Sequence, residues 1–149
     1  MKHVCQIRPV APADAAQWLR MRRSLWPESG TGTHSVEIAE WRNRHDAVVL
    51  VLVRDDGRLG GFAEIGERSV ADGCTTSPVA DLEGWYVDPE LRRTGLGTAL
   101  VRMAEGWARE HGYREFASDV ELPNVISQRA HEALGFTEMG RAVLYLKQL

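Results

Sequence analysis

The sequence has few cysteines, no long hydrophobic run and no excess of positive charge, and each absence excludes a class of protein. Cys5 and Cys74 are too few for a disulfide framework, and neither CxxC nor HExxH occurs, so we expect no metal. The longest apolar run, Ala47 to Val53, is too short for a membrane-spanning helix. The first residues lack the apolar stretch of a secretory signal. We therefore expect a cytoplasmic protein that does not bind membranes.

The charge balance argues against a nucleic-acid-binding protein. With 21 acidic and 18 basic residues the net charge is −3, whereas nucleic-acid binding depends on many cationic contacts to phosphates. Hydrophobic residues make up 44% and charged residues 26% of the 149 residues, which is ordinary globular composition. No repeat, low-complexity tract or linker is visible. The sequence thus predicts a single domain over residues 1–149.

Hydrophobic spacing and turn residues predict an α/β protein of the mixed α+β kind, in which helices cover both faces of a mixed sheet. The predicted strands are 4–8, 47–53, 59–67, 81–87, 115–119 and 141–147, with 136–138 as a candidate for one more. The predicted helices are 12–25, 35–45, 96–111 and 124–134. The segment 69–80 is a long loop, and such loops tend to be functional.

The segment 87–97 places two arginines and two glycines between a predicted strand and a long helix. The first amides of a helix have no internal acceptor and lie at the positive end of its dipole. A turn with Arg92, Arg93, Gly95 and Gly97 therefore suits a phosphate or diphosphate. The dinucleotide fingerprint and the P-loop are excluded, because a third glycine and a GxxxxGK[ST] pattern are absent. Taken alone, the glycines are equally typical of a tight strand-to-helix turn without a ligand.

The pattern Arg92-x-x-Gly95-x-Gly97 before an amphipathic helix resembles the acyl-CoA motif of the GNAT acetyltransferase superfamily. Further segments resemble its aminoglycoside 6′-N-acetyltransferases: Leu25-Trp26-Pro27, Asp72-Gly73-Cys74, Ser77-Pro78-Val79, Leu82-Glu83-Gly84, Ala117-Ser118-Asp119, Ile126-Ser127-Gln128 and His131 before Leu134-Gly135-Phe136. The resemblance implies the GNAT fold with a mostly antiparallel sheet, acetyl-CoA as co-substrate and an aminoglycoside as acceptor. It also implies a homodimer in which the C-terminal strand is paired or exchanged.

The resemblance places Glu83, Asp119 and Trp26 in the acceptor site. Freeing the lone pair of an alkylammonium costs about 4.6 kcal/mol at pH 7, so a base is needed. Glu83 is expected to bind the cation and accept its proton, directly or through a water. Asp119 would hold another ammonium or assist as base. From the residues alone, Glu83 could instead be a solvated edge residue, Asp119 a turn residue and Trp26 a core aromatic.

For the cofactor, the resemblance assigns the pantetheine arm and thioester carbonyl to the backbone of Trp85, Tyr86 and Val87. The diphosphate is assigned to the turn and helix start, which comprise Arg92, Arg93, Thr94, Gly95, Leu96, Gly97 and Thr98. Asn124 would contact pantetheine, cap the following helix, or both.

Two positions depart from the family pattern. Where many of these enzymes carry a tyrosine that protonates the CoA sulfur, this chain has His131, which can act near neutral pH or simply pack. Tyr145 and solvent are the alternative proton donors. Gly140 stands where the family often has a carboxylate. Acetyl transfer to another small-molecule or protein amine, and an acyl-CoA sensor without turnover, are the rival functions.

Overall fold

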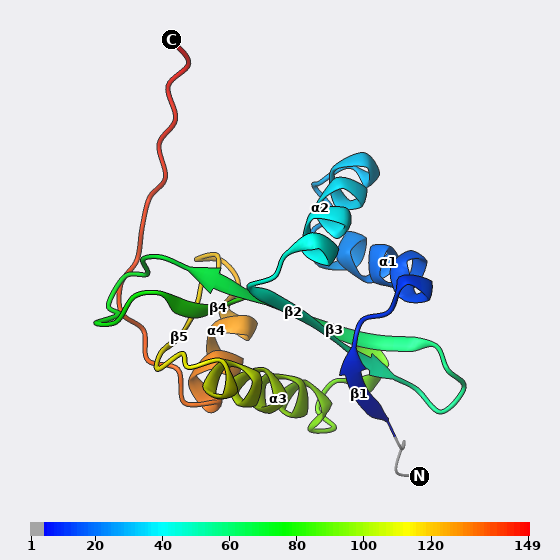
Figure 1. Cartoon of the computed structure of the whole chain (residues 1–149). Coiled ribbons are helices and arrows are strands. Elements are labelled where there is room, and N and C mark those ends of the chain that lie inside the picture. Colours follow the sequence, from blue (N-terminus) through cyan, green and yellow to red (C-terminus); the bar gives the residue numbers. More distant parts are fainter. Residues whose placement is uncertain (1–4) are drawn as a thin grey trace.

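The computed structural model describes residues 5–149, and its strands form one sheet (Figure 1). They lie side by side in chain order: β1 (Gln6–Pro9), β2 (Ala47–Val53), β3 (Leu59–Arg68), β4 (Val79–Val87) and β5 (Phe116–Ser118). Neighbouring strands are antiparallel except for β4 and β5, which are parallel. The expected mixed, mostly antiparallel sheet is thus confirmed. Residue 4, the first of the strand that the sequence predicts at 4–8, lies outside the described residues.

Helices cover both faces of the sheet, as the sequence pattern predicts (Figure 1). One face carries α1 (Ala15–Leu25) and α2 (Thr31–Asn43), and the other carries α3 (Leu96–Glu110) and α4 (Val125–Ala133). Short 3-10 turns, η1 (Pro12–Asp14) and η2 (Pro89–Leu91), precede α1 and follow β4. The molecule therefore has three layers, with the sheet in the middle.

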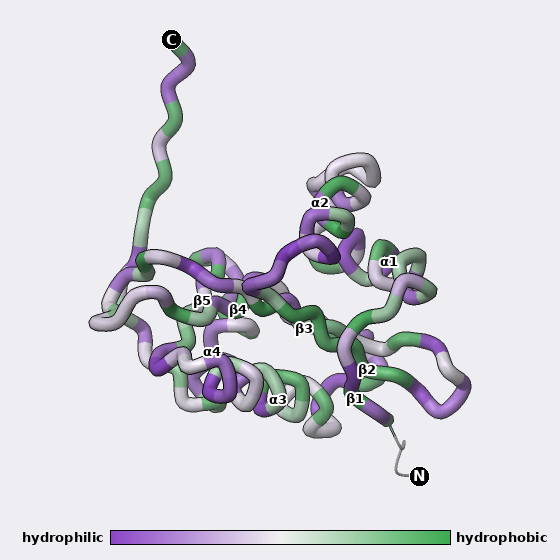
Figure 2. The backbone as a smooth tube through the Cα atoms, viewed as in Figure 1, coloured by the Kyte–Doolittle hydropathy of each residue, from purple (hydrophilic) through white to green (hydrophobic). Residues whose placement is uncertain are grey.

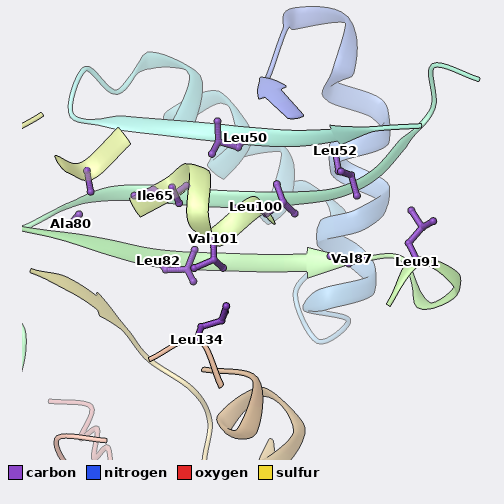
Figure 3. Close-up of a cluster of buried hydrophobic side chains, with 13 residues drawn as sticks. Leu50, Leu52, Ile65, Ala80, Leu82, Val87, Leu91, Leu100, Val101 and Leu134 are labelled. Carbon is purple, nitrogen blue, oxygen red and sulfur yellow. The ribbon is translucent and has the colours of Figure 1, made fainter. Parts of the chain in front are cut away.

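Two clusters of buried apolar side chains hold the helices to the sheet. Successive residues of a strand point to opposite faces, so Leu50 and Leu52 of β2 face α3 while Val49 and Val51 face α1. The α3 cluster also contains Ile65, Ala80, Leu82, Leu100, Val101, Ala104 and Leu134 (Figure 3). The α1 cluster contains Trp18, Met21, Ile38, Phe62 and Tyr86. β2 through β4 are therefore packed on both faces, which makes them a rigid support for polar groups at their ends.

The C-terminal strand predicted at 141–147 is wrong for this chain alone, and so is the candidate strand at 136–138. Residues 136–149 form no helix or strand, and the chain leaves the body of the molecule as an extended tail (Figure 1). Hydrophobic and hydrophilic stretches follow one another along it (Figure 2). The tail has the β-branched and aromatic residues of a strand, but a strand forms only where a partner strand supplies hydrogen bonds.

Other boundaries differ from the sequence expectation by a few residues, among them the starts of α2 and β4. α2 begins at Thr31 rather than at residue 35, although Thr and Gly are weak helix formers. Its first turns bring His34 into complete burial against α1, so tertiary packing overrides propensity there. β4 begins at Val79, which shortens the predicted 69–80 loop.

Candidate active site

Glu83 is an extra residue in β4, opposite a regular stretch of β3. Glu64 pairs with Gly84 and Ile65 pairs with Leu82, which leaves Glu83 without a partner. Such a β-bulge bends its strand and redirects the extra side chain. The Glu83 side chain is 38% exposed, while the residues on either side of it are buried. The bulge therefore presents a carboxylate from a strand that is otherwise largely buried.

β4 and β5 part beyond this bulge. β5 pairs only with residues 80–82, and no strand in the described part of the chain covers the same edge of β4 over residues 83–87. Free N–H and C=O groups on a strand edge can bind an extended ligand as if it were an added strand. Of the segment assigned to pantetheine, Trp85 and Val87 turn backbone groups to this edge, while Tyr86 turns its own toward β3. Val87 O already accepts a hydrogen bond from Arg92, so the Val87 N–H and the backbone groups of Trp85 are the ones available.

The first turn of α3 offers amides that no side chain caps. Its N-cap is Gly95 at φ +87°, and the first helical hydrogen bond runs from Ala99 N to Gly95 O, 3.0 Å. The amides of residues 96–98 donate to no acceptor within residues 5–149. Nothing lies within 4 Å of the point where a Cβ on Gly95 would be. An anion can therefore approach the positive end of this helix closely.

The side chains of the same turn mostly hold the turn itself. Arg92 Nε donates to Val87 O at 2.8 Å, and its guanidinium lies 5.6 Å from the centre of the Tyr86 ring. The Thr94 hydroxyl donates to the backbone of η2. Arg93 has φ +62°, a left-handed conformation that is uncommon for a residue with a side chain. The backbone is thus the part of this turn that is arranged for an anion, with the two arginines adding positive charge nearby.

A cleft of about 450 Å³ opens beside the bulge; we call it the acceptor cleft. It is lined by Arg44, Glu67, Arg68, Asp81, Leu82, Glu83 and Asp119. Four carboxylates against two guanidinium groups make it negative, which suits a polycation. Glu83 and Asp119, which the resemblance puts in one site, are brought together here. A hollow of about 530 Å³ along residues 20–31 is larger, but its charged side chains are arginines, so it does not suit a cation.

Two arginines that the sequence analysis missed pair with these carboxylates. Arg44 Nη1 lies 3.2 Å from Glu83 Oε2, and Arg68 Nη1 lies 3.1 Å from Asp119 Oδ2. Asp119 is 82% exposed, so water screens its pair, and exposed pairs of this kind are weak. Such contacts can open when a cationic ligand arrives. No spacing in the sequence links these arginines to their partners, since the members of each pair are 39 and 51 residues apart in the chain.

Asp81 is a further carboxylate of the cleft that the sequence analysis missed. It is only 7% exposed, and within the described residues its Oδ1 accepts no hydrogen bond. Burial, together with the negative charge of Glu83, raises the pKa of Asp81 to about 6. The signal that could have revealed it is its spacing of two from Glu83, because alternate residues of a strand share a face.

Trp26 lies against β4 next to the bulge. A Cβ on Gly84 would come within 2.8 Å of Trp26 Cη2, so only glycine lets the indole pack this closely. His34 Nε2 donates to the Trp26 carbonyl at 3.2 Å, and the Arg22 guanidinium lies 4.8 Å from its ring. Trp26 thus packs on β4 next to Glu83, against the core cluster of α1 and α2, and it is not among the residues that line the acceptor cleft.

A buried ion pair stands behind Trp26. Arg22 donates to Glu64 Oε1, which also accepts a hydrogen bond of 3.0 Å from Trp18 Nε1. Arg22 Nε lies 3.3 Å from His34 Nδ1, which links the pair to the histidine that binds the Trp26 carbonyl. Burial raises the pKa of Glu64 to about 7 despite the guanidinium. This network positions Trp26, and sequence periodicity gives no sign of it.

His131 lies on the α3 side of the sheet, with its ring centre 5.5 Å from that of Trp85. Its Nδ1 lies 2.8 Å from Ser127 O, and its Nε2 lies 2.8 Å from Ser118 Oγ. Ser118 Oγ is in turn 3.1 Å from Leu82 O. A hydrogen-bonded path therefore runs from His131 to the place where β4 and β5 part.

The remaining candidates lie outside this arrangement. The Asn124 side chain accepts a hydrogen bond of 3.1 Å from Ser127 N, so it caps α4. Tyr145 is 92% exposed in the extended tail and does not line the acceptor cleft. Gly140 also precedes that tail and contributes no carboxylate.

The sequence model of the acetyltransferase (GNAT) family matches residues 15–136. The chain belongs to this family. Among similar members, the aminoglycoside N(6′)-acetyltransferase type 1 of Klebsiella aerogenes is 47% identical over 146 residues, which are 96% of each chain. The enzyme of the same name from Stenotrophomonas maltophilia is 38% identical over 93% of this chain and 90% of its own.

Solved structures of GNAT proteins superpose closely on the fold. The aminoglycoside 6′-N-acetyltransferase AAC(6′)-Ih from Acinetobacter baumannii gives a TM-score of 0.91 at 36% identity, over 98% of this chain and 99% of its own. AAC(6′)-Iy in complex with a bisubstrate analog, CoA-S-monomethyl-acetylneamine, gives 0.91 at 33% identity, with the same coverage. The GNAT fold expected from the sequence is confirmed. None of the helices between residues 5 and 149 has the length and hydrophobicity of a membrane span.

Proposed function

We propose that this GNAT protein is an aminoglycoside 6′-N-acetyltransferase, which moves the acetyl group of acetyl-CoA directly to the 6′-amine of the antibiotic and so confers resistance. One observation carries the proposal. The bulge puts Glu83 in a negatively charged cleft at the point where β4 leaves β5 and exposes a free backbone edge. A site for a polycation and a site for an extended cofactor thus meet at one carboxylate. The names and structures of the relatives support the same activity.

The residues present fit acetyl-CoA, which supplies the activated acetyl group when bound. The amides of residues 96–98 and the φ +87° turn at Gly95 would hold the diphosphate, with Arg92 or Arg93 adding charge. The free edge over residues 85–87 would hold the pantetheine arm. An edge amide aimed at the thioester oxygen would stabilise the negative charge that develops there. Asn124 caps α4 and would contact pantetheine from that position.

Glu83 is the proposed base. Glu83 first binds the ammonium as an ion pair. The nitrogen must lose one proton to free its lone pair and a second as its bond to the acetyl carbon forms and the carbon–sulfur bond breaks. Glu83 accepts these protons in turn, directly or through a water, and passes them to solvent, while the departing sulfur takes up one. Asp119 holds another ammonium of the substrate or assists with the proton. Trp26 forms the apolar wall against which the sugar packs.

His131 is the proposed source of the proton that the departing sulfur takes up. Its contact with Ser118 Oγ leads toward the β4–β5 opening, where the free edge would place the thioester. A thiol has a reference pKa near 8.5, so the thiolate needs less assistance than the amine does. Loss of His131 should therefore reduce the rate less than loss of Glu83.

The proposal is tested by measuring CoA release with kanamycin or tobramycin as acceptor. Wild-type protein should turn over both, and Glu83→Gln should lower kcat by about 10²-fold or more. Glu110→Gln is the matched control, because it makes the same change on an exposed residue at the far end of α3. Folded protein that binds acetyl-CoA but acetylates no 6′-amino aminoglycoside would overturn the proposal.

A 6′-hydroxy aminoglycoside separates the rival functions. The proposed enzyme acetylates no group at that position, whereas an acetyltransferase for unrelated amines has no reason to distinguish the two antibiotics. An acyl-CoA sensor releases no CoA with either compound, and its Glu83→Gln variant has no rate to lose.

We also propose a homodimer in which the tails are exchanged. The outer edge of β5 pairs with no strand among residues 5–149, and the side chains of Val143, Leu144, Tyr145 and Leu146 are 70–92% exposed. An unpaired strand edge and exposed apolar side chains both favour aggregation, and pairing with the tail of a second copy would cover them. Light scattering should give twice the monomer mass, and removal of residues 141–149 should give the mass of one shortened chain. A full-length monomer would contradict the exchange.

We treat residues 1–149 as one acetyltransferase domain, because both core clusters share a single sheet. We also propose a cytoplasmic enzyme, since acetyl-CoA is an intracellular metabolite.

A further inference from the structure

Asp81 differs from the other carboxylates of the acceptor cleft in what it binds. Glu83 accepts a hydrogen bond from Arg44, Asp119 accepts one from Arg68, and Glu67 accepts one of 2.5 Å from the Tyr113 hydroxyl. Within the described residues, Asp81 Oδ1 accepts none. The nearest guanidinium nitrogen, Arg68 Nη1, is 4.0 Å away, which is beyond hydrogen-bond distance.

The missing hydrogen bond at Asp81 Oδ1 costs free energy because the side chain is buried among like charges. Its side chain is nine-tenths buried, and water does not reach Oδ1. A buried carboxylate oxygen without a donor loses its hydration, and the Arg68 charge 4.0 Å away offsets only part of that loss. Glu83 and Asp119 lie in the same cleft and add repulsion between like charges. A site of this kind is satisfied by a cation that carries N–H donors.

We propose that Asp81 binds a second ammonium group of the substrate while the reacting amine faces Glu83. The inference rests on the proposed function and names a specificity residue for it. An alkylammonium has three N–H donors, so one such group supplies the bond that Oδ1 lacks and neutralises the cleft. In the free protein Arg68 Nη1 donates to Asp119 and lies 4.0 Å from Asp81 Oδ1, and the ammonium reaches Oδ1 when Arg68 moves aside and leaves its place to the substrate cation. Asp81 thereby selects acceptors with two or more amines over monoamines.

The test compares Asp81→Asn with wild type on two acceptors. Kanamycin carries several amines, and methyl 6-amino-6-deoxy-α-D-glucopyranoside carries only the reacting one. Asp81→Asn should raise the KM for kanamycin by about tenfold or more and change kcat less than threefold. The kcat/KM for the monoamine and the KM for acetyl-CoA should change less than threefold.

Asp56→Asn is the matched control, because it removes the same charge from an exposed turn where Asp56 pairs with Arg58. It should leave all four constants unchanged. Thermal melting separates binding from folding: Asp81→Asn, which removes an unsatisfied buried charge, should melt at the wild-type temperature or above. A lower melting temperature with reduced activity would make Asp81 a structural residue and overturn the proposal.

Two further results also count against it. An equal loss on kanamycin and the monoamine would mean that Asp81 acts on the reacting amine, and no loss on either would mean that it binds no substrate group. In both cases the wild-type turnover of kanamycin stands, so the proposed function survives. Absence of wild-type turnover would instead refute the proposed function and this inference with it.

Discussion

Arg44 donates a hydrogen bond to Glu83, with Nη1 3.2 Å from Oε2, so a cation of the chain itself engages the proposed base in the free protein. Both side chains are partly exposed, at 28% and 38%. Ion pairs in such surroundings contribute about 1 kcal/mol or less. A substrate ammonium that binds Glu83 therefore has to displace Arg44, and the displacement costs little.

Replacing Arg44 should therefore strengthen acceptor binding. We expect Arg44→Gln to lower the KM for kanamycin about threefold, which corresponds to about 0.6 kcal/mol, and to leave the KM for acetyl-CoA unchanged. Steady-state assays of CoA release at low ionic strength measure both. Arg42→Gln, on the exposed side of α2, removes the same charge and should have no effect. A raised KM for Arg44→Gln would mean that Arg44 orients Glu83 instead of competing for it.

The sequence predicts the central strands and the long helix well because their signals are local. The β-branched run of β2 and the apolar stripe of α3 each fix an element regardless of what it packs against. The tail at 141–147 has an equally good strand pattern, yet it forms no strand here. The difference is that a strand needs hydrogen bonds from a neighbour, which no local pattern supplies.

The residues of the acceptor cleft are also only partly predictable, because local patterns do not show which distant segments meet. Glu83 and Asp119 could be found because they follow motifs, but the bulge that exposes Glu83 is a mismatch between β3 and β4. Pairing register is a property of two strands together, so it is not readable from either one. Asp81, Arg44 and Arg68 could not be found from the sequence for the same reason. They come together only where the end of α2 meets β3, β4 and β5 in the folded chain.

Acceptor binding should depend on pH through Asp81. The pKa of this group is raised from 3.8 to about 6, so protonation below pH 6 removes the charge that would bind the second ammonium. We expect the KM for kanamycin to rise as the pH falls from 7 to 5. The Asp81→Asn variant, which has no charge to lose, should lack this step. An identical pH profile in the two proteins would contradict the assignment.

The same group predicts how stability varies with pH. An acid whose pKa is higher in the folded state binds more protons there, so between pH 3.8 and 6 the contribution of Asp81 to folding stability falls as the pH rises. Asp81→Asn should raise the free energy of unfolding by about 1 to 2 kcal/mol at pH 8, and the gain should shrink toward pH 4. Urea titrations of both proteins at the two pH values measure this. A variant that is less stable at pH 8 would refute the prediction.

The buried pair behind Trp26 should be sensitive to loss of one partner. Arg22→Met leaves Glu64 buried without its guanidinium, which should cost about 3–5 kcal/mol in the free energy of unfolding. The double variant Arg22→Met, Glu64→Gln removes both charges but keeps an amide oxygen that accepts from Trp18 Nε1, so it should recover most of that loss. Chemical denaturation of the three proteins gives the values. A double variant as unstable as the single one would show that the charges are not coupled.

Gly95 begins the proposed diphosphate site, and its φ of +87° is strained for any residue with a Cβ. Gly95→Ala should cost about 1–2 kcal/mol of stability if the turn is kept, and it adds a methyl group where nothing now lies within 4 Å. If that space admits the diphosphate, the methyl group obstructs it, and the Kd for CoA should rise about tenfold or more by calorimetry.

Gly57→Ala is the matched control, because Gly57 has φ +83° and open space but lies in the β2–β3 turn. It should lose comparable stability with unchanged CoA binding. Equal CoA affinity in all three proteins would mean that the mouth of α3 does not bind the diphosphate.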